Sequence, residues 1–177
     1  MVYNYQKQNL RVCGIQMENH YASTFESPVG RITILAGDDF VHTITFSEVV
    51  ISDSTDNELT RKVAAQLEQY FKGDLRTFDF PIRQKGTAFQ QGVWQNLLNI
   101  PYGETISYAK FAEHQPLAIR AIAAANGKNK IAIAIPCHRV IGSSGKLVGY
   151  AGGLRRKQWL LEHEQEVAQK GQTTLKF

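Results

Sequence analysis

The chain has 177 residues and a formal net charge of +4, so it is long enough to bury the core of one sizeable domain or of two small ones. No segment approaches the roughly 18 consecutive apolar residues of a membrane span, and residues 1–20 lack the apolar stretch of a signal peptide, so we expect a cytoplasmic protein, associated with the nucleoid if it is bacterial. The two cysteines, Cys13 and Cys137, fit no disulfide or metal-ligand spacing, so we expect free thiols and no metal.

Residues 1–85 are predicted to form a small α/β domain. β-branched and aromatic residues flank a Gly-Asp-Asp turn, which indicates a hairpin, and apolar residues then recur at helical spacing until Gly73. Pro81 and Gly86 mark the end of this unit. The predicted elements are a hairpin over residues 30–46, a loop over 47–57, a helix over 58–71 and a strand over 76–82.

Residues 86–177 are predicted to form a second, mainly helical domain. Ser107 is a suitable helix N-cap, Pro116 suits a helix start and Gly127 a helix end, so two short helices joined by a tight turn resemble a helix-turn-helix. Trp94 is expected in the core. The predicted helices span residues 89–98, 108–114, 117–126 and 154–167.

Positive charge is concentrated in residues 101–160, which carry nine basic side chains and two acidic ones. Within this region the helix over residues 117–126 is dominated by alanine, so its backbone can approach a partner closely, and Arg120 is its one long cation. A basic region of this kind favours DNA binding, with a solvated basic face or a packed internal helix as alternatives. The nine residues are Lys110, Arg120, Lys128, Lys130, Arg139, Lys146, Arg155, Arg156 and Lys157.

Cys137 lies directly before His138, at the end of an apolar run. Three isoleucines alternate with alanines over residues 131–135, which predicts a buried strand that ends at Pro136. A histidine that takes the thiol proton generates the reactive thiolate. Neighbouring side chains of a strand point to opposite faces, so the chain must turn here for the two residues to cooperate. The alternative is an inert buried cysteine beside an incidental histidine.

Glu164 is the third member of a predicted nucleophilic triad. In the last helix it lies on the apolar stripe, with Leu160 and Leu161 one turn before it and Val167 one turn after. A buried carboxylate needs a partner, and an imidazole N–H is a natural one. We therefore expect Cys137 as nucleophile, His138 as base and Glu164 as the group that orients the imidazole.

Three segments of the chain resemble a known family. The family is that of the O6-alkylguanine-DNA alkyltransferases, or methylated-DNA-protein cysteine methyltransferases. Its signature resembles two segments of this chain, IPCHRVIGSSG and GYAGGLRRKQWLLEHE. The part of the family that precedes the signature resembles GTAFQQGVWQNLLNIPYGETISYAKFA. The resemblance covers roughly residues 58–165. It implies an α/β N-terminal domain of ribonuclease-H-like topology and a C-terminal domain with a winged-helix-like helix-turn-helix. It also implies a cysteine that accepts an alkyl group from guanine O6 in duplex DNA, once and without a cofactor; we expect a monomer.

The resemblance also assigns roles to individual residues. Cys137 is the acceptor, with His138 and Glu164 as its activating partners. Asn129 ties the recognition helix to the active-site strand, and Arg120 enters the base stack while the damaged nucleotide turns out. Tyr108 is the hydrogen-bond or proton donor to the guanine. The remaining substrate or DNA contacts are Arg139, Val148, Gly149 and Tyr150.

The chain departs from the family pattern in two places. The interval from Tyr108 to Arg120 is about two residues shorter than usual, and Ala151 stands where many relatives have serine. Cys13 and His20 lack further ligands for zinc. A non-catalytic lesion-binding protein and a Cys-His-Glu hydrolase are the competing functions. The sequence leaves open which alkyl groups fit and whether O4-alkylthymine is accepted.

Overall fold

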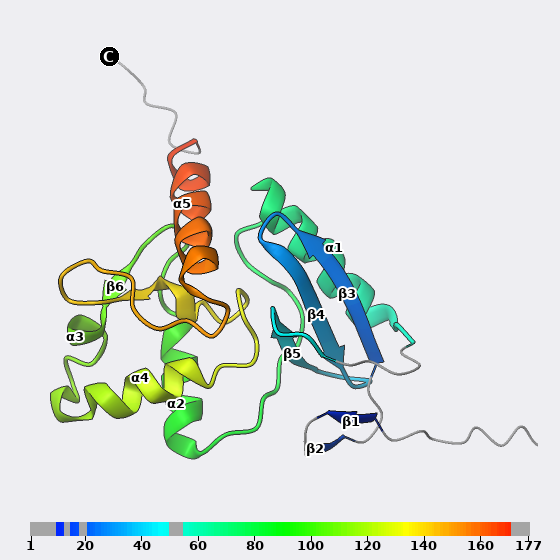
Figure 1. Ribbon diagram of the computed structural model, residues 1–177, viewed down its shortest axis with the longest axis horizontal. Coiled ribbons are helices and arrows are strands. Elements are labelled where there is room, and N and C mark those ends of the chain that lie inside the picture. The colour runs from blue at the N-terminus through cyan, green and yellow to red at the C-terminus, as the bar shows by residue number, and fades with distance from the viewer. Residues whose placement is uncertain (1–9, 13–14, 18–20, 50–54, 171–177) are drawn as a thin grey trace, which may run out of the picture.

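The computed structural model describes residues 10–12, 15–17, 21–49 and 55–170 (Figure 1). A small antiparallel sheet with one long helix comes from the first half of the chain, and several helices with two very short strands come from the second. In chain order the elements are β1 (Leu10–Val12), β2 (Ile15–Met17), β3 (Tyr21–Ser27), β4 (Gly30–Ala36), β5 (Val41–Thr45), α1 (Glu58–Lys72), α2 (Ala88–Leu97), β6 (Ile106–Ser107), α3 (Tyr108–Phe111), η1 (Pro116–Ala118), α4 (Ile119–Gly127), η2 (Cys137–Arg139), β7 (Val140–Ile141) and α5 (Leu154–Lys170).

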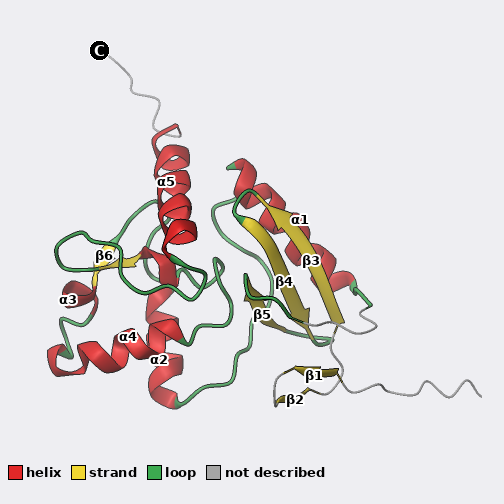
Figure 2. Cartoon of the chain, viewed as in Figure 1, coloured by secondary structure: helices red, strands yellow, loops and turns green. Residues whose placement is uncertain are grey.

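The first half is organised around an antiparallel sheet with the strand order β3-β4-β5, and α1 packs against β3 and β4 (Figure 2). The predicted hairpin over residues 30–46 is confirmed as β4 and β5. Because β4 is the central strand, residues 32–36 are all buried. Strand β3 was not predicted: its sequence, YASTFES, is rich in hydroxyl and acidic side chains, and Ala22 is its one buried residue.

Helix α1 confirms the helix predicted over residues 58–71. Its first turn is closed by a capping box, in which the Asn57 side chain accepts from the Thr60 N–H and the Thr60 hydroxyl accepts from the Asn57 N–H. Gly73 ends it in the left-handed conformation, with φ of 84°. One side of the helix buries Val63, Leu67 and Tyr70 in the hydrophobic core.

The strand predicted over residues 76–82 is wrong. Only Ile82 pairs there, through a single parallel bridge to Val41 at the sheet edge. Pro81 has no N–H to extend the ladder, although its carbonyl accepts from the Val41 N–H. The aromatic residues of the segment pack inward instead, with the Phe78 ring 5.6 Å from that of Tyr70.

The helices of the second half follow the predicted order, although their boundaries differ: α3 and α4 are shorter than predicted and α5 is longer. The helix predicted over 89–98 is α2, and the one over 154–167 is α5. Ser107 caps α3 as expected, but α3 ends at Phe111, and the helix predicted over 117–126 begins as the 3₁₀ turn η1 before continuing as α4. Trp94 lies in the core as predicted, and its indole N–H donates to the Ala125 carbonyl at 2.9 Å, which fixes α2 against α4.

The strand predicted over residues 131–135 is also wrong, although its three isoleucines are buried as expected. Only Ile131 pairs, with Ile44 of β5, and the chain then winds into a turn in which the Ile135 N–H donates to the Ile131 carbonyl. Ile133 has a φ of 69°, a conformation that a β-branched residue adopts only when its surroundings enforce it. Asn129 enforces it, because its side chain bonds Ile131 and Ile135 backbone groups.

The two halves share one hydrophobic core and are joined by polar contacts. Arg156 of α5 reaches the turn between β3 and β4, where its Nε donates to the Val29 carbonyl at 2.8 Å. It also donates to the Gly152 carbonyl at 2.9 Å, and its guanidinium lies 4.9 Å from the centre of the Phe46 ring. This residue therefore links the sheet to the loop before α5.

We predict that Arg156→Ala lowers the free energy of unfolding by about 1–3 kcal/mol, because its hydrogen bond to Val29 and its contact with the Phe46 ring, which join the two halves, are lost. Arg155→Ala is the matched control: Arg155 is exposed, and its loss should change the free energy of unfolding by less than about 0.5 kcal/mol. Urea unfolding of both variants measures the difference. Equal effects of the two substitutions would show that the Arg156 contacts do not hold the halves together.

Candidate active site

Cys137 opens the short 3₁₀ helix η2, directly after the turn that the three isoleucines form. The side chain is nearly buried, with 6% of the residue exposed. The Asn129 side-chain N–H donates to Cys137 Sγ at 3.2 Å, so the residue that holds the turn also contacts the sulfur. The thiol is thus fixed by a turn rather than by the predicted strand.

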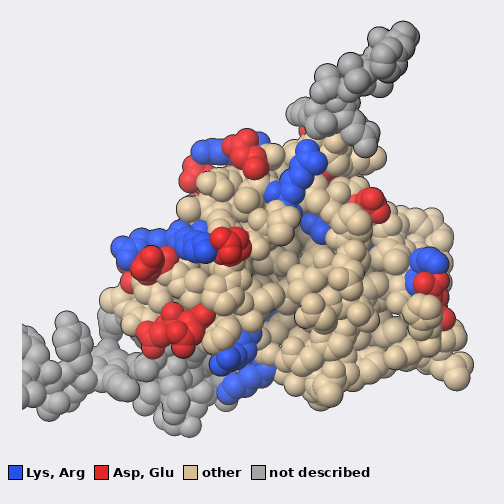
Figure 3. All heavy atoms as spheres, turned by 180° about the vertical axis from the view of Figure 1, so that it is seen from behind, with Lys and Arg blue, Asp and Glu red and all other residues tan. Residues whose placement is uncertain are grey.

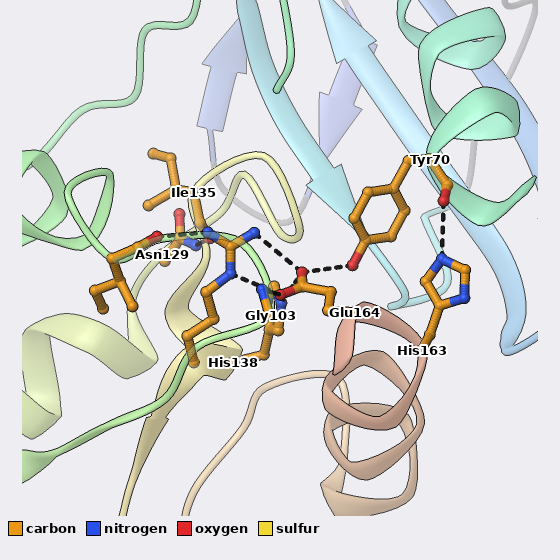
Figure 4. Close-up of polar contacts among 9 residues, drawn as sticks. Tyr70, Gly103, Asn129, Ile135, His138, His163 and Glu164 are labelled. Atoms are coloured by element: carbon orange, nitrogen blue, oxygen red, sulfur yellow. Dashed lines mark hydrogen bonds and ion pairs between the residues drawn. The ribbon is translucent and has the colours of Figure 1, made fainter. Parts of the chain in front are cut away.

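Glu164 of α5 is completely buried and accepts hydrogen bonds from four residues (Figure 4). The imidazole Nε2 of His138 lies 2.8 Å from its Oε1, so the predicted His–Glu contact is present. Arg139 donates from Nε at 2.8 Å and from its terminal nitrogen at 3.1 Å. The Tyr70 hydroxyl donates at 2.7 Å and the Gly103 N–H at 3.2 Å. Burial alone would raise the pKa of Glu164, but His138 and Arg139 hold it well below its usual range.

His138 presents one free nitrogen. Because the carboxylate of Glu164 can only accept, Nε2 must carry the hydrogen in the contact between them, and in the neutral imidazole Nδ1 then has the free lone pair. Nδ1 is buried and has no hydrogen-bond partner among the described residues. It is therefore the basic atom of the site, although no direct hydrogen bond joins His138 to Cys137 among the contacts of the described chain.

The Cys137 thiol is not a preformed thiolate. Burial raises its pKa, while the Asn129 hydrogen bond and the Lys157 ammonium act in the opposite direction. Lys157 is a group that the sequence reasoning missed as part of the site. It is fully buried, its Nζ donates to the carbonyls of Val140 and Val148, and burial lowers its pKa to about 8. Its position seven residues before Glu164, on the same helix face, was the available signal.

Tyr108 meets the site from the start of α3. The parallel pairing of β6 with β7 sets Ile106 beside Val140 and Ser107 beside Ile141. The half-buried Tyr108 hydroxyl accepts from the Asn126 side-chain N–H at 2.6 Å. Asn126, at the end of α4, also donates to the Cys137 carbonyl at 3.3 Å. The sequence reasoning did not identify Asn126, because it ends a helix whose other residues are mostly apolar.

The loop before α5 carries three of the residues expected at the substrate. Tyr150 is half-buried, its ring centre lies 6.4 Å from that of His138, and its hydroxyl has no partner in the described structure. The backbone of Val148 is held by Lys157, while its side chain is partly exposed. Gly149 has a φ of 34°, within the region that favours glycine. Ala151 is exposed in the same loop.

The basic region is less continuous than its sequence predicts. Arg139 was expected to contact substrate or DNA, but it is buried against Glu164, and Lys157 is buried as well. On the face in Figure 3, much of the surface over the C-terminal half is uncharged. Arg120 is exposed on α4 and makes none of the contacts around Cys137. The exposed cations of the region are Lys110, Arg120, Lys128, Lys130, Lys146 and Arg155.

Within residues 10–12, 15–17, 21–49 and 55–170, no group of three or more His, Cys, Asp or Glu side chains is arranged to hold a metal ion. No helix in those segments is long and apolar enough to cross a membrane. Cys13 and His20 lie outside the described residues.

We predict that Glu164→Gln lowers the free energy of unfolding by about 3–5 kcal/mol near neutral pH, because it removes the counter-charge of a buried ion pair. The folded pKa of Glu164 is depressed, so its stabilisation is present above the unfolded value of about 4.3 and is lost as the pH falls toward the folded one. The difference from wild type should therefore narrow in acid, as measured by urea unfolding across the acid range. Glu162→Gln, exposed on the same helix, is the control; a pH-independent difference would contradict the prediction.

Two family models match the chain in succession. The ribonuclease-like domain of 6-O-methylguanine DNA methyltransferase matches residues 20–84, and the DNA-binding domain of 6-O-methylguanine DNA methyltransferase matches residues 88–166. The expected fold, a ribonuclease-like N-terminal unit followed by a mainly helical DNA-binding unit, is therefore confirmed.

Individual relatives agree with the family models. A methylated-DNA–protein-cysteine methyltransferase of Methanosarcina acetivorans is 43% identical over 81% of this chain and 97% of its own length. The crystal structure of Mycobacterium tuberculosis O6-methylguanine methyltransferase is 42% identical, with a TM-score of 0.75 over 83% of this chain and 93% of its own. The Mycobacterium tuberculosis OGT in complex with DNA has a TM-score of 0.76 at 42% identity, over 83% of this chain and 94% of its own. On its sequence and its fold, this chain belongs to the 6-O-methylguanine DNA methyltransferase family.

Proposed function

We propose that this protein repairs DNA by transferring the methyl group of O6-methylguanine to its own Cys137. The activity is that of a methylated-DNA–protein-cysteine methyltransferase, the name carried by its curated relatives. The observation that supports Cys137 as the acceptor is its position: its sulfur contacts Asn129, and it directly precedes the buried His138 that Glu164 and Arg139 hold. Cys13, the other cysteine, lies outside the described residues.

The transfer moves one methyl group and two protons, one from the thiol and one from Tyr108. His138 takes the thiol proton at Nδ1, through one water molecule because no direct hydrogen bond joins the residues. The thiolate attacks the methyl carbon, the S–C bond forms, the C–O6 bond breaks, and its electron pair stays with the guanine. Tyr108 donates its hydroxyl proton to the guanine ring as this charge develops. The imidazolium and the phenolate then return to their neutral forms by exchange with water.

This scheme explains why a thiol with a raised pKa is compatible with transfer. A resting thiol is protected from other alkylating and oxidising agents, because the thiolate is the reactive form. Deprotonation occurs when the substrate fills the site and the proton can pass to His138. A thioether carbon–sulfur bond is not hydrolysed in the cell, so each molecule acts once and no cofactor is needed.

DNA is the partner, and a relative of similar fold has been solved in complex with DNA. We propose that the substrate is duplex DNA that contains an O6-alkylguanine, and that the protein binds it as a monomer. The alkyl group lies within the base stack, so the nucleotide must turn out into the protein at a cost of a few kcal/mol. We assign Arg120, exposed on α4, to the vacated position in the stack, and Tyr150, Val148 and Gly149 to contacts with the extruded base.

The two halves of the chain have different proposed roles. We propose that residues 1–85 form a supporting domain and that residues 86–177 form the domain that binds DNA and accepts the alkyl group. All the residues assigned to substrate, DNA and proton transfer belong to the second part. The supporting domain contributes the Tyr70 hydroxyl to Glu164 and the backbone contact of Arg156.

Cys137→Ala is expected to abolish methyl transfer while DNA binding changes by less than about twofold, because the substitution removes the nucleophile and no exposed cation. The assay incubates the protein with a duplex that contains O6-methylguanine and measures intact and peptide masses. Cys13→Ala is the matched control and should still gain one methyl group on the Cys137 peptide. Binding without a mass change in wild type would favour a lesion-binding protein, and neither binding nor mass change would favour a hydrolase.

Arg120→Ala is expected to slow repair of the duplex at least about 10-fold, since about 1.4 kcal/mol of extrusion energy corresponds to a factor of ten. Reaction with free O6-benzylguanine should change by less than about twofold, because a free base needs no extrusion. Single-turnover rates with both substrates test the assignment. Equal slowing of both would mean that Arg120 supports the folded site rather than extrusion.

A further inference from the structure

Asn126 links the proposed proton donor to the proposed nucleophile. It lies in the last turn of α4 and is 4% exposed. Its side-chain nitrogen Nδ2 donates to the Tyr108 hydroxyl oxygen at 2.6 Å and to the Cys137 carbonyl oxygen at 3.3 Å. The scheme of proton transfer above uses Tyr108 and Cys137 but gives Asn126 no role.

The Cys137 carbonyl fixes the orientation of the Asn126 amide. A carbonyl oxygen can only accept, so the side-chain nitrogen, and not the side-chain oxygen, must face it. The same nitrogen faces Tyr108, so the tyrosine oxygen is the acceptor in that contact. The amide oxygen of Asn126 is buried and has no partner in the described chain.

The orientation of the amide determines where the tyrosine hydrogen can point. A phenol has one hydrogen to donate, and an amide N–H cannot accept it. The Tyr108 hydrogen must therefore point away from Asn126, and it stays available for a ligand. A donor to the phenol oxygen also makes the O–H a better proton donor: burial raises the pKa of Tyr108, and the hydrogen bond from Asn126 lowers it.

We propose that Asn126 is a positioning residue for alkyl transfer, which acts through Tyr108 by directing the tyrosine hydroxyl hydrogen toward the guanine and stabilising the phenolate that remains after the proton has left. This inference rests on the proposed function. It concerns the departure of guanine and not the formation of the thiolate. The role of Asn126 therefore differs from that of Asn129, which contacts the sulfur.

The first test is a double-mutant cycle. Asn126→Leu keeps the approximate shape of the side chain and should slow demethylation of duplex O6-methylguanine about 10-fold, and Tyr108→Phe should slow it about 100-fold, at the low end for general acid catalysis. Because Asn126 acts through the hydroxyl, Asn126→Leu should have less than about a twofold effect in the Tyr108→Phe background. An undiminished effect in that background would overturn the proposal.

A second readout separates proton donation from positioning of the sulfur. Alkylation of Cys137 by iodoacetamide expels iodide, which needs no proton, so Asn126→Leu should change that rate by less than about twofold. Slowing of both reactions would show that Asn126 acts through the Cys137 backbone and would overturn the proposal. Asn96→Leu, the same change at an exposed position of α2, is the control for both reactions.

A further variant keeps the test valid if Asn126→Leu does not fold. Asn126→Asp has the same shape but offers an acceptor in place of the donor, so it should draw the Tyr108 hydrogen away from the guanine and slow demethylation at least as much as Asn126→Leu. Rates equal to those of wild type would overturn the proposal. Wild-type protein is measured beside the variants: if it gains no methyl group from DNA, the proposed function fails, whereas transfer by wild type with unchanged variants refutes the role of Asn126 alone.

Discussion

A carboxylate inside a protein is stable only where donors surround it, and the structure of this protein is built around such a carboxylate, that of Glu164. Five hydrogen bonds from four residues converge on its two oxygens. The donors come from α1, from the loop before β6 and from η2, so the carboxylate on α5 connects segments that are far apart in sequence. Removing any donor would leave part of a buried charge unsatisfied.

The charged group of this network, Glu164, is distinct from the groups that we propose to react. The charge of Glu164 is balanced by Arg139, and the contact with Glu164 fixes which nitrogen of His138 carries the hydrogen. The Cys137 sulfur takes no part in this network and instead contacts Asn129. Tyr108 accepts a hydrogen bond from Asn126. The proposed base, nucleophile and proton donor are therefore each held by a different buried partner.

The sequence predicted those parts of the fold that depend on local signals. The N-cap at Ser107 located α3, the apolar stripes located α1, α2 and α5, and the position of Glu164 on such a stripe led to the His–Glu contact. Period-two alternation over residues 131–135 was misleading, because buried isoleucines are equally satisfied in a compact turn that Asn129 holds. The burial of Arg139 and Lys157 could not be inferred from their charge, since a cation enters a core only where acceptors from distant segments meet it. The role of Asn126 could not be inferred either, because its hydrogen-bond partners, Tyr108 and Cys137, are 18 and 11 residues away along the chain.

The hydroxyl of Tyr70 has a consequence for how the chain could be shortened. This oxygen belongs to α1 in the first half, yet it is one of the groups that solvate the carboxylate in the second half. A fragment that began at residue 86 would retain every assigned reactive group but would lose a donor, and a hydrogen bond to a charged acceptor contributes about 1.5–3 kcal/mol. A minimal version of this protein would thus need a replacement donor at that point, supplied by solvent or by a redesigned side chain, before the reactive half could stand alone.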